Sequence, residues 1–465
     1  MSSFSFMVHE KTTTALTFED FKIEVLNDYK IAVTSRECSL LGRKEVLTGK
    51  AKFGIFGDGK EVPQLAMAKY FKNGDFRSGY YRDQTFMMAI GQLSIKEFFA
   101  GLYGHTDLDY EPMSAGRQMG GHFVTHSLHA DGSWKNLTEQ KNSSSDISPT
   151  AAQMPRLLGL AYASKIYRQV PGITNAENFS NEGNEIAWGT IGNASTSEGV
   201  FFETINAAGV LQVPMVMSVW DDEYGISVHA KHQTTKESIS EILKGYQREN
   251  GTNGFEILQV KGWDYADLIA TYEKAAEVAR KEHVPVLVHV SQLTQPQGHS
   301  SSGSHERYKS TERLAWEKDY DCIRQMRLWM IAINIASPEE LDEIDANAKI
   351  AVLEGKKEAW KEFIDPIIHE QKELLLLLEK VAEMSQNKTK ILQLTAVLKN
   401  TKDPLKKEIL GTARKVLRLV NKESGQAELS QWIQNYTAVT QQKFSSHLHS
   451  ESNSNVYSVQ PVAPK

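Results

Sequence analysis

Apolar residues follow one another in two patterns along the chain. Up to about residue 130 they recur with helical spacing, and the intervening loops are dense in Gly, Arg, Asp and His. From about residue 150, helical stretches alternate with short apolar runs that are typical of buried strands. The expected strands are 185–191, 213–220, 255–260 and 284–290, and the expected helices around them are 155–167, 198–210, 237–249 and 265–282.

This alternation predicts the fold class. Strands that alternate with helices of this length need right-handed crossovers, and they form a mostly parallel sheet with helices on both faces. We therefore predict an α/β fold. Ligands bind such sheets at the carboxyl ends of the strands, so chemistry is expected in the loops after Ile191, Trp220 and Val290.

The strand-like runs stop after about residue 335. Ser337-Pro338, Asp365-Pro366 and Asp403-Pro404 each place a capping side chain before a proline suited to the first turn of a helix. Three or four helices are expected there, followed by a connector rich in Ser, Asn, His and Pro. We predict an N-terminal helical segment at 1–60, an α/β domain at 61–335, an all-helical extension at 336–448 and a flexible linker at 449–465.

Composition narrows the function classes. The 465 residues carry 52 Lys and Arg against 58 Asp and Glu, a net charge of −6 without a basic face, which argues against nucleic acid. The most apolar stretch, 209–220, is interrupted by Gln212 and Pro214 and is too short to cross a membrane. Cys38 and Cys322 are too few for a disulfide framework, and no secretory signal is recognisable, so we expect a cytoplasmic protein.

The loop after the expected strand 185–191 carries candidate chemistry. In Gly192-Asn193-Ala194-Ser195, small residues let backbone N–H groups approach an anion, and a following helix N-terminus favours a diphosphate. Twenty-six residues separate Ala194 from Asp221-Asp222 at the end of the next strand. Asn193 and Asp222 thus reach neighbouring strand ends, with the oxygen ligands that Mg²⁺ prefers. Taken alone, the segment fits a plain turn and a solvated strand end better, because short glycine motifs are weak.

Several motifs in order along the chain resemble those of one family. The GNA–x26–DD segment, with Tyr224-Gly225-Ile226-Ser227 after it, is similar to the thiamine diphosphate fingerprint, whose usual form is GDG, some two dozen residues, then NN. The STSEG at 195–199 is typical of the alpha subunit of the first component of 2-oxoacid dehydrogenase complexes. Further matches are GYYRDQ at 79–84, GRQM at 116–119, SP at 148–149 with QMP at 153–155, and GHS at 298–300. The resemblance covers about residues 20–350, and GRQM favours the branched-chain type.

The resemblance implies thiamine diphosphate and Mg²⁺ as cofactors. Tyr81 and Arg82 match the diphosphate-binding pair, and Arg offers forked donors to phosphate oxygens. His299 matches a histidine that assists acyl transfer to the lipoyl carrier, work that suits a group able to hold or donate a proton near neutral pH. The implied cofactor-binding positions are Tyr81, Arg82, Ser148, Thr150, Gly192, Ala194, Ser195, Ile226 and His299.

The expected metal ligands depart from the family pattern. Asn193 stands where the family usually has an acidic residue, and Asp222 stands where it has the second Asn. We expect a swapped pair that keeps one carboxylate and binds Mg²⁺ together with the backbone carbonyl of Tyr224. Replacing Asp222 by Asn is then expected to lower magnesium-dependent cofactor affinity sharply.

The function implied by the resemblance is oxidative decarboxylation of a 2-oxoacid, with transfer of the acyl group to lipoyl-lysine of the acyltransferase component. A branched-chain acid such as 3-methyl-2-oxobutanoate is favoured, and pyruvate remains open. Residues 350–465 show no beta-type half, which in the family activates the cofactor. Expected partners are a beta-type half, either separate or fused in a longer chain, and the lipoyl domain. The expected assembly is a heterotetramer or a dimer of fused chains, and this chain is expected to be inactive without the beta half. The alternatives are a transketolase-like thiamine enzyme and a catalytically silent assembly subunit.

Overall fold

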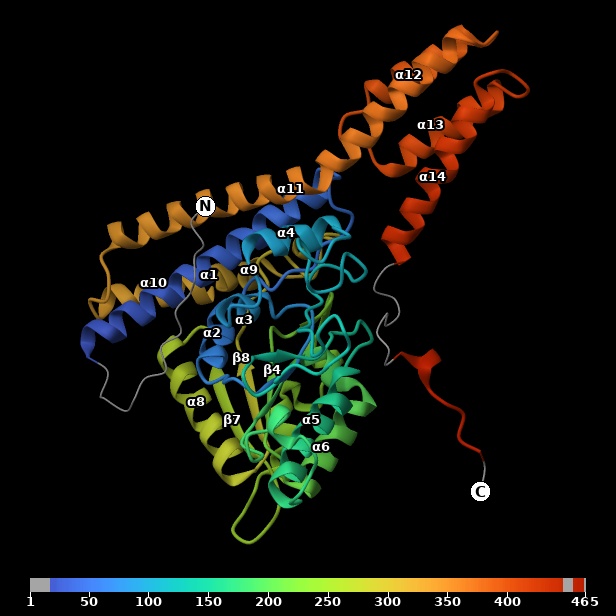
Figure 1. The fold of residues 1–465 in the computed structure, drawn as a ribbon. Coiled ribbons are helices and arrows are strands. Elements are labelled where there is room, and N and C mark those ends of the chain that lie inside the picture. The colour runs from blue at the N-terminus through green and yellow to red at the C-terminus, as the bar shows by residue number, and fades with distance from the viewer. Residues whose placement is uncertain (1–16, 446–454, 464–465) are drawn as a thin grey trace.

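The computed structural model describes residues 17–445 and 455–463. Its centre is a six-stranded sheet in the order β2-β1-β3-β4-β8-β7, and each neighbouring pair is parallel (Figure 1). The strands are β1 (Phe76–Ser78), β2 (Asn142–Ser143), β3 (Ala187–Gly192), β4 (Met215–Trp220), β7 (Glu256–Lys261) and β8 (Val286–Ser291). The predicted mostly parallel sheet is therefore confirmed, although β1 and β2 are too short to show a strand pattern in the sequence.

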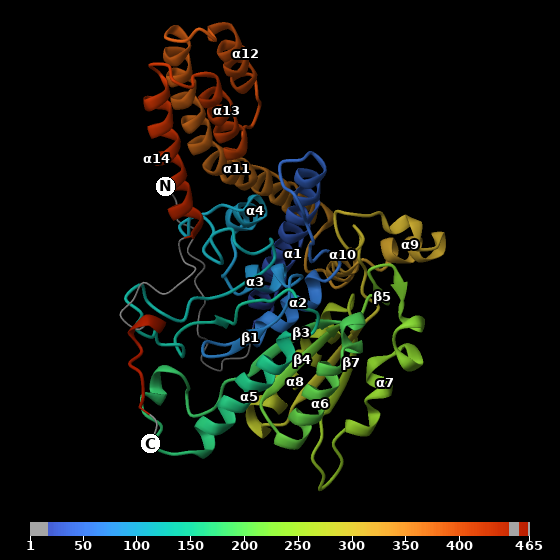
Figure 2. The same cartoon turned by 90° about the vertical axis from the view of Figure 1, so that its right-hand side faces the viewer.

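Helices cover both faces of the sheet, as Figures 1 and 2 show. Successive side chains of a strand point to opposite faces, so the central strands feed two hydrophobic cores. Trp188 and Val216 belong to the core on one face, and Ile191 and Met217 belong to the core on the other. The covering helices are α2 (Glu61–Lys69) and α8 (Tyr265–Glu277) for the first core, and α5 (Gln153–Gln169) and α6 (Gly199–Leu211) for the second.

The remaining regular elements surround this centre. Ser94 begins one of the shorter helices with a reciprocal capping box to Glu97, and Gly104 ends it in the left-handed conformation that glycine favours. The elements before α11 are α1 (Phe18–Leu47), α3 (Gln84–Ala89), α4 (Ile95–Tyr103), β5 (Tyr224–Gly225), β6 (Val228–His229), α7 (Ile239–Ile242), α9 (Thr311–Asp319) and α10 (Cys322–Ala332). The helices after them are α11 (Pro338–Glu383), α12 (Lys388–Lys399), α13 (Lys406–Leu419) and α14 (Gln426–Ser445).

The helix predicted over 237–249 is wrong for most of its length. Only α7 forms, followed by a short 3₁₀ turn. The chain then leaves the helical path, because Arg248 donates its backbone N–H to the carbonyl of Phe255 and Phe255 donates its own to Tyr246. Pairing with the segment that leads into β7 therefore outweighs the helical periodicity.

The sequence predicts that a helix begins at Pro366, but Pro366 lies inside α11. Ser337 does begin that helix, in a capping box with Glu340. A proline inside a helix removes the backbone donor for the carbonyl four residues earlier. Ala359 before the proline and Ile367 after it are buried in two different cores, so packing holds the helix on both sides of Pro366.

The helical extension shares its first helix with the main domain. Leu341, Val352 and Ala359 of α11 belong to the large core with α1 and α4, whereas Ile364 and later residues form a separate core with α12, α13 and α14. Figure 2 shows these last helices projecting away from the sheet. Judged by packing, the boundary between the main domain and the helical extension therefore lies within α11, between Ala359 and Ile364, and not at residue 336.

The ends of the chain are described only in part. Of the expected linker at 449–465, the structure describes 455–463, an exposed stretch with one short turn at Val456–Ser458. Residues 449–454 and 464–465, and residues 1–16 of the expected N-terminal segment, lie outside the described residues. Among the residues that the structure does describe, no helix has the length and apolarity needed to cross a membrane.

Candidate cofactor-binding site

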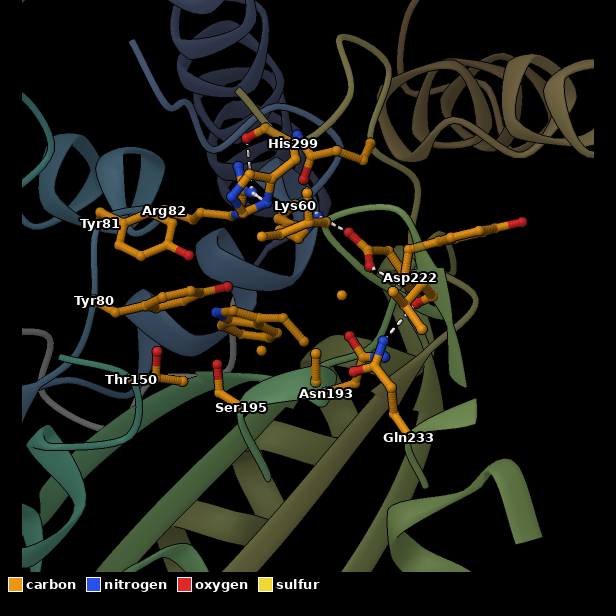
Figure 3. A pocket seen from close by; sticks show the side chains of 18 of the residues that line it. Lys60, Tyr80, Tyr81, Arg82, Thr150, Asn193, Ser195, Asp222, Gln233 and His299 are labelled. Carbon is orange, nitrogen blue, oxygen red and sulfur yellow. Dashed lines mark hydrogen bonds and ion pairs between the residues drawn. The ribbon is translucent and has the colours of Figure 1, made fainter. Parts of the chain in front are cut away.

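A cavity of about 420 Å³ lies at the carboxyl ends of β3 and β4 (Figure 3). Gly192 pairs with Trp220 at the ends of these strands, so the loops that follow leave the sheet side by side. Eleven of the twelve site residues expected from the sequence line this cavity. They are Tyr81, Arg82, Thr150, Gly192, Asn193, Ala194, Ser195, Asp222, Tyr224, Ile226 and His299.

The two loops close against each other at the cavity floor. After β3 the chain turns through a 3₁₀ helix at Asn193–Ser197, and the hydroxyl of Thr196 donates to the carbonyl of Asn193 at 2.6 Å. A side chain at Gly225 would place its Cβ 2.5 Å from the Cβ of Ala194, so only glycine allows this approach. Asn193 is thereby buried beside the loop that carries Asp222.

Asp222 is held by a lysine that the sequence analysis missed. The ammonium Nζ of Lys60 donates to Oδ2 of Asp222 at 2.9 Å, to the carbonyl of Thr294 at 3.1 Å and to Oε1 of Gln295 at 2.7 Å. The backbone N–H of Tyr224 donates to Oδ1 of Asp222 at 3.2 Å. Burial raises the pKa of Asp222, but Lys60 first, then Arg82 and Lys309, outweigh burial and hold that pKa below its usual value. Asp222 is therefore a carboxylate at neutral pH.

Two glycines place Lys60 at the cavity. A Cβ at Gly57 would lie 2.2 Å from the carbonyl oxygen of Arg82, and a Cβ at Gly59 would lie 2.2 Å from that of Thr294. Gly59 also has a φ of +86°, in the left-handed region that glycine favours. The Gly57–Gly59 loop therefore fits tightly between two other segments and delivers Lys60 to the start of α2.

Arg82 connects the cavity to the loop that bears His299. Its Nη1 donates to the carbonyl of Phe56 at 2.6 Å, and its Nη2 lies 3.0 Å from both Nδ1 and the carbonyl oxygen of His299. Asp83 pairs instead with the buried Arg77, at 2.7 Å, so the guanidinium of Arg82 is not neutralised by its sequence neighbour. Arg82 therefore remains available as a cation within the cavity wall.

The protonation of His299 differs from the expectation. A guanidinium only donates hydrogen bonds, so Nδ1 of His299 accepts one and the proton of the neutral ring lies on Nε2. Burial, followed by the charge of Arg82, lowers the pKa of His299 to about 4. At neutral pH His299 is consequently an uncharged hydrogen-bond donor, and the expected titration near pH 7 does not occur in this state.

The cavity lining carries an excess of positive charge. Lys60, Arg82 and Lys309 line it, and Asp222 is the one carboxylate among its lining residues. Lys309 pairs with Glu317 at 2.7 Å behind the cavity wall, and burial lowers the pKa of Lys309. This arrangement suits a ligand with a multiply charged anionic end.

Aromatic rings form another part of the wall. The rings of Tyr80 and Tyr81 lie 4.8 Å apart, and Trp220 also lines the cavity. Figure 3 shows both tyrosines opposite the side that carries Asp222, with Thr150 and Ser195 beneath Tyr80. A ligand with a charged group at one end and a flat ring system at the other therefore matches the two sides.

Ser148 is the expected site residue that does not line the cavity. Its hydroxyl lies 3.1 Å from Nε2 of His122, and Nδ1 of His122 lies 3.1 Å from the carbonyl of Met119. The Ser148 side chain thus connects the GRQM segment to the loop before Thr150. Sequence reasoning also missed other lining residues. Tyr80 lies within the GYYRDQ segment and Gln295 lies shortly before GHS, so proximity to a motif was an available signal for these two, whereas Tyr308 and Lys309 lie farther from any motif.

The oxygen atoms near Asp222 are of the type that a divalent cation binds, but the net charge of the groups that carry them does not favour a cation. Within the described parts of the chain, no three His, Cys, Asp or Glu side chains are grouped as a metal site. Asn193 and the backbone carbonyl of Tyr224 are neutral ligands, and the carboxylate of Asp222 already faces the ammonium of Lys60. The residues present thus fit a diphosphate better than they fit Mg²⁺.

Comparisons with known proteins identify a family for this chain. A family model described as "Dehydrogenase E1 component" matches residues 29–367. The chain is 27% identical to the 2-oxoisovalerate dehydrogenase subunit alpha of Bacillus subtilis over 305 residues. These aligned residues cover 64% of this chain and 80% of that protein. The chain is 24% identical over 315 residues to the mitochondrial 2-oxoisovalerate dehydrogenase subunit alpha 1 of Arabidopsis thaliana, covering 67% of this chain and 58% of that protein.

A third relative is the pyruvate dehydrogenase E1 component subunit alpha of Rickettsia bellii, 26% identical over 204 residues, or 44% of this chain and 56% of that protein. The chain therefore spans less than two thirds of two of these three relatives. The family uses thiamine diphosphate, with Mg²⁺ as its usual partner metal. With its parallel sheet and its cation-lined cavity at the strand ends, this chain belongs to the dehydrogenase E1 component family, as an alpha-type member of these thiamine diphosphate-dependent oxidoreductases.

Proposed function

We propose that this chain provides the diphosphate-binding half of a thiamine diphosphate site in an enzyme that oxidatively decarboxylates a 2-oxoacid and transfers the acyl group to lipoyl-lysine of an acyltransferase component. The observation that supports it most is the cavity at the β3 and β4 ends, where three cationic side chains face one carboxylate. The names of two relatives favour 2-oxoisovalerate, a branched-chain acid, as the substrate. Pyruvate is the second candidate, favoured by the name of the Rickettsia relative.

The residues divide the binding work between the two sides of the cavity. Arg82 and the N–H groups of the Asn193–Ser197 turn bind the diphosphate, with Lys60 adding positive charge. Tyr80 and Tyr81 bound the part of the cavity that takes the rings. When bound, thiamine diphosphate supplies the electron sink that decarboxylation requires. Asn193, Asp222 and the Tyr224 carbonyl remain the proposed ligands of any divalent cation.

His299 acts as a hydrogen-bond donor in this proposal. Its Nδ1 is occupied by Arg82, so Nε2–H is the group left to orient an acyl acceptor near the cofactor. A bound diphosphate adds negative charge close to the ring, and such a charge raises the pKa of a histidine. The imidazole thus moves toward a titratable range only when the cofactor is in place.

The cavity is open where a partner is expected. Ile226 and Val228 line it, and yet they are 62% and 43% exposed. Exposed apolar side chains at the rim of a site are typical of a surface that another chain covers. We propose that a beta-type half, separate or fused, completes the site and that the lipoyl domain then docks on the assembly. The cytoplasmic location expected from the sequence stays a prediction.

Reconstitution tests this proposal. The chain is mixed with a beta-type subunit, thiamine diphosphate and Mg²⁺, and decarboxylation of a panel of 2-oxoacids is followed with an artificial electron acceptor. We expect activity that requires both chains and is higher with 3-methyl-2-oxobutanoate than with pyruvate. Transfer of a two-carbon unit between sugars without 2-oxoacid decarboxylation would show a transketolase-like enzyme. Cofactor binding to neither chain nor mixture would show a silent assembly subunit.

A further inference from the structure

A lysine occupies the charged end of the cavity where the family usually relies on a metal ion. The Lys60 ammonium is almost completely buried, and its three hydrogen-bond acceptors are Asp222, Thr294 and Gln295. An ammonium has three N–H donors, so each of them has a protein acceptor. Lys60 is therefore a fixed charge in the cavity wall and not a flexible surface group.

The charge on Asp222 is consequently already balanced. Lys60 and Asp222 form an ion pair of 2.9 Å, with 2% and 11% of their side chains exposed. Asn193 brings an uncharged amide to the same end of the cavity. A divalent cation placed there meets no unpaired carboxylate among the lining residues, and it meets the like charge of the ammonium.

Resting on the proposed function, we propose that the ammonium group of Lys60 is a built-in cation of the diphosphate site, so that this chain binds diphosphate without needing a divalent metal ion. The ammonium adds positive charge at the cavity floor, and Arg82 and the N–H groups after β3 make the direct hydrogen bonds. Figure 3 shows the Lys60 and Asp222 side chains pointing toward each other at the edge of this space, with Arg82 nearby.

The placement of Lys60 supports a role beyond local packing. The Gly57–Gly59 loop accepts no Cβ at either glycine, so the backbone ahead of Lys60 is fixed between the Arg82 and Thr294 segments. A purely structural lysine needs no such proximity to the cavity. Here the same loop that contacts the Arg82 carbonyl delivers a second cation to the same ligand space.

The test measures binding of inorganic pyrophosphate to the purified chain by calorimetry, once with Mg²⁺ and once with EDTA. Binding of Mn²⁺ alone, followed by electron paramagnetic resonance, reports directly on the cation site. For the unmodified protein we expect nearly equal pyrophosphate affinities in the two buffers and no saturable Mn²⁺ site. For Lys60→Gln we expect an affinity about 10-fold or more lower in EDTA, restored largely by Mg²⁺, and a new Mn²⁺ site.

Lys309→Gln is the matched control, because Lys309 lines the same cavity but pairs with Glu317 and not with Asp222. It is expected to weaken pyrophosphate binding equally in both buffers. The double variant Lys60→Gln/Asp222→Asn replaces the ion pair by a neutral pair and covers the case in which Lys60→Gln fails to fold. Because it lacks the ammonium, it is expected to bind pyrophosphate more weakly than the single variant Asp222→Asn, equally in both buffers, and to bind no Mn²⁺.

Two results separate the inference from the proposed function. If the unmodified chain needs Mg²⁺ for a 10-fold or larger gain in pyrophosphate affinity and Lys60→Gln leaves that ratio unchanged, the role of Lys60 is overturned while the diphosphate site stands. If the unmodified chain binds neither pyrophosphate nor thiamine diphosphate under either condition, the proposed function fails together with the inference.

Discussion

Arg82→Met removes the cation that best fits a direct contact with the diphosphate. The residue is 5% exposed, and its guanidinium makes three hydrogen bonds, one to Phe56 and two to His299. An arginine has five N–H donors, so about two remain for a ligand in the cavity. Methionine keeps much of the side-chain volume and loses every donor, which makes the change mainly electrostatic.

The expected loss follows from these contacts. A hydrogen bond to a charged group contributes about 1.5–3 kcal/mol, so losing one raises the dissociation constant for thiamine diphosphate by roughly 10- to 150-fold. The carbonyls of Phe56 and His299 also lose their donor, which lowers the free energy of unfolding by about 1–3 kcal/mol. The pKa of His299 rises toward its usual value, because burial and the charge of Lys60 then depress it without the charge of Arg82.

Calorimetry measures the affinity, urea denaturation measures stability, and histidine proton resonances followed against pH measure the His299 titration. Arg43→Met is the matched control: Arg43 donates to the carbonyls of Ser300 and Gly303 in the same loop but does not line the cavity. It should leave thiamine diphosphate affinity unchanged. An Arg82→Met protein that folds and binds the cofactor as tightly as the unmodified protein would show that Arg82 does not contact the diphosphate.

Four further outcomes are expected. Asp222→Asn raises pyrophosphate affinity in EDTA, measured by calorimetry, because it removes the one lining carboxylate and leaves the Lys60 charge unpaired; a sharp loss of affinity in Mg²⁺ that is absent in EDTA would instead support the metal-ligand role expected from the sequence. Gly59→Ala lowers the free energy of unfolding by about 2 kcal/mol or more, measured in urea, since its Cβ would meet the Thr294 carbonyl at a positive φ. Burial, then Arg168, lowers the pKa of His283 to about 4, so the unfolded chain protonates this histidine at a higher pH than the folded chain does. The contribution of neutral His283 to the free energy of unfolding is therefore complete above about pH 6.5 and is lost as the pH falls toward 4, and it is absent from the pH profile of His283→Gln. Ser148→Ala keeps thiamine diphosphate affinity in the same titration, because its hydroxyl contacts His122 outside the cavity.

The sheet and the loops after β3 and β4 were predictable because their signals are local. Apolar runs marked both strands, and the Gly192-Asn193-Ala194 and Asp221-Asp222 segments followed them directly. Parallel pairing then forces the two loops together, as the register of Gly192 with Trp220 shows. The strand ends therefore located the two loops at the centre of the candidate site, whereas Tyr81, Arg82, Thr150 and His299 were expected only from the family resemblance.

Other features depend on contacts that no local pattern contains. Lys60 meets Asp222 across 162 residues, and its position depends on the fit of the Gly57–Gly59 loop against distant carbonyls. The low pKa of His299 likewise results from burial and from Arg82, 217 residues earlier. Pro366 continues a helix because packing on both sides holds α11 together. These features depend on the tertiary structure. The sequence pattern therefore missed Lys60, predicted that His299 titrates near neutral pH and predicted that a helix begins at Pro366.

The most direct measurement of the central claim is a crystal structure of the chain with thiamine diphosphate, grown in EDTA. We expect diphosphate density between Arg82, Lys60 and the Asn193–Ser197 turn, with the Lys60–Asp222 pair intact. Diphosphate bound elsewhere, or an empty cavity at a saturating concentration of the cofactor, would contradict the claim.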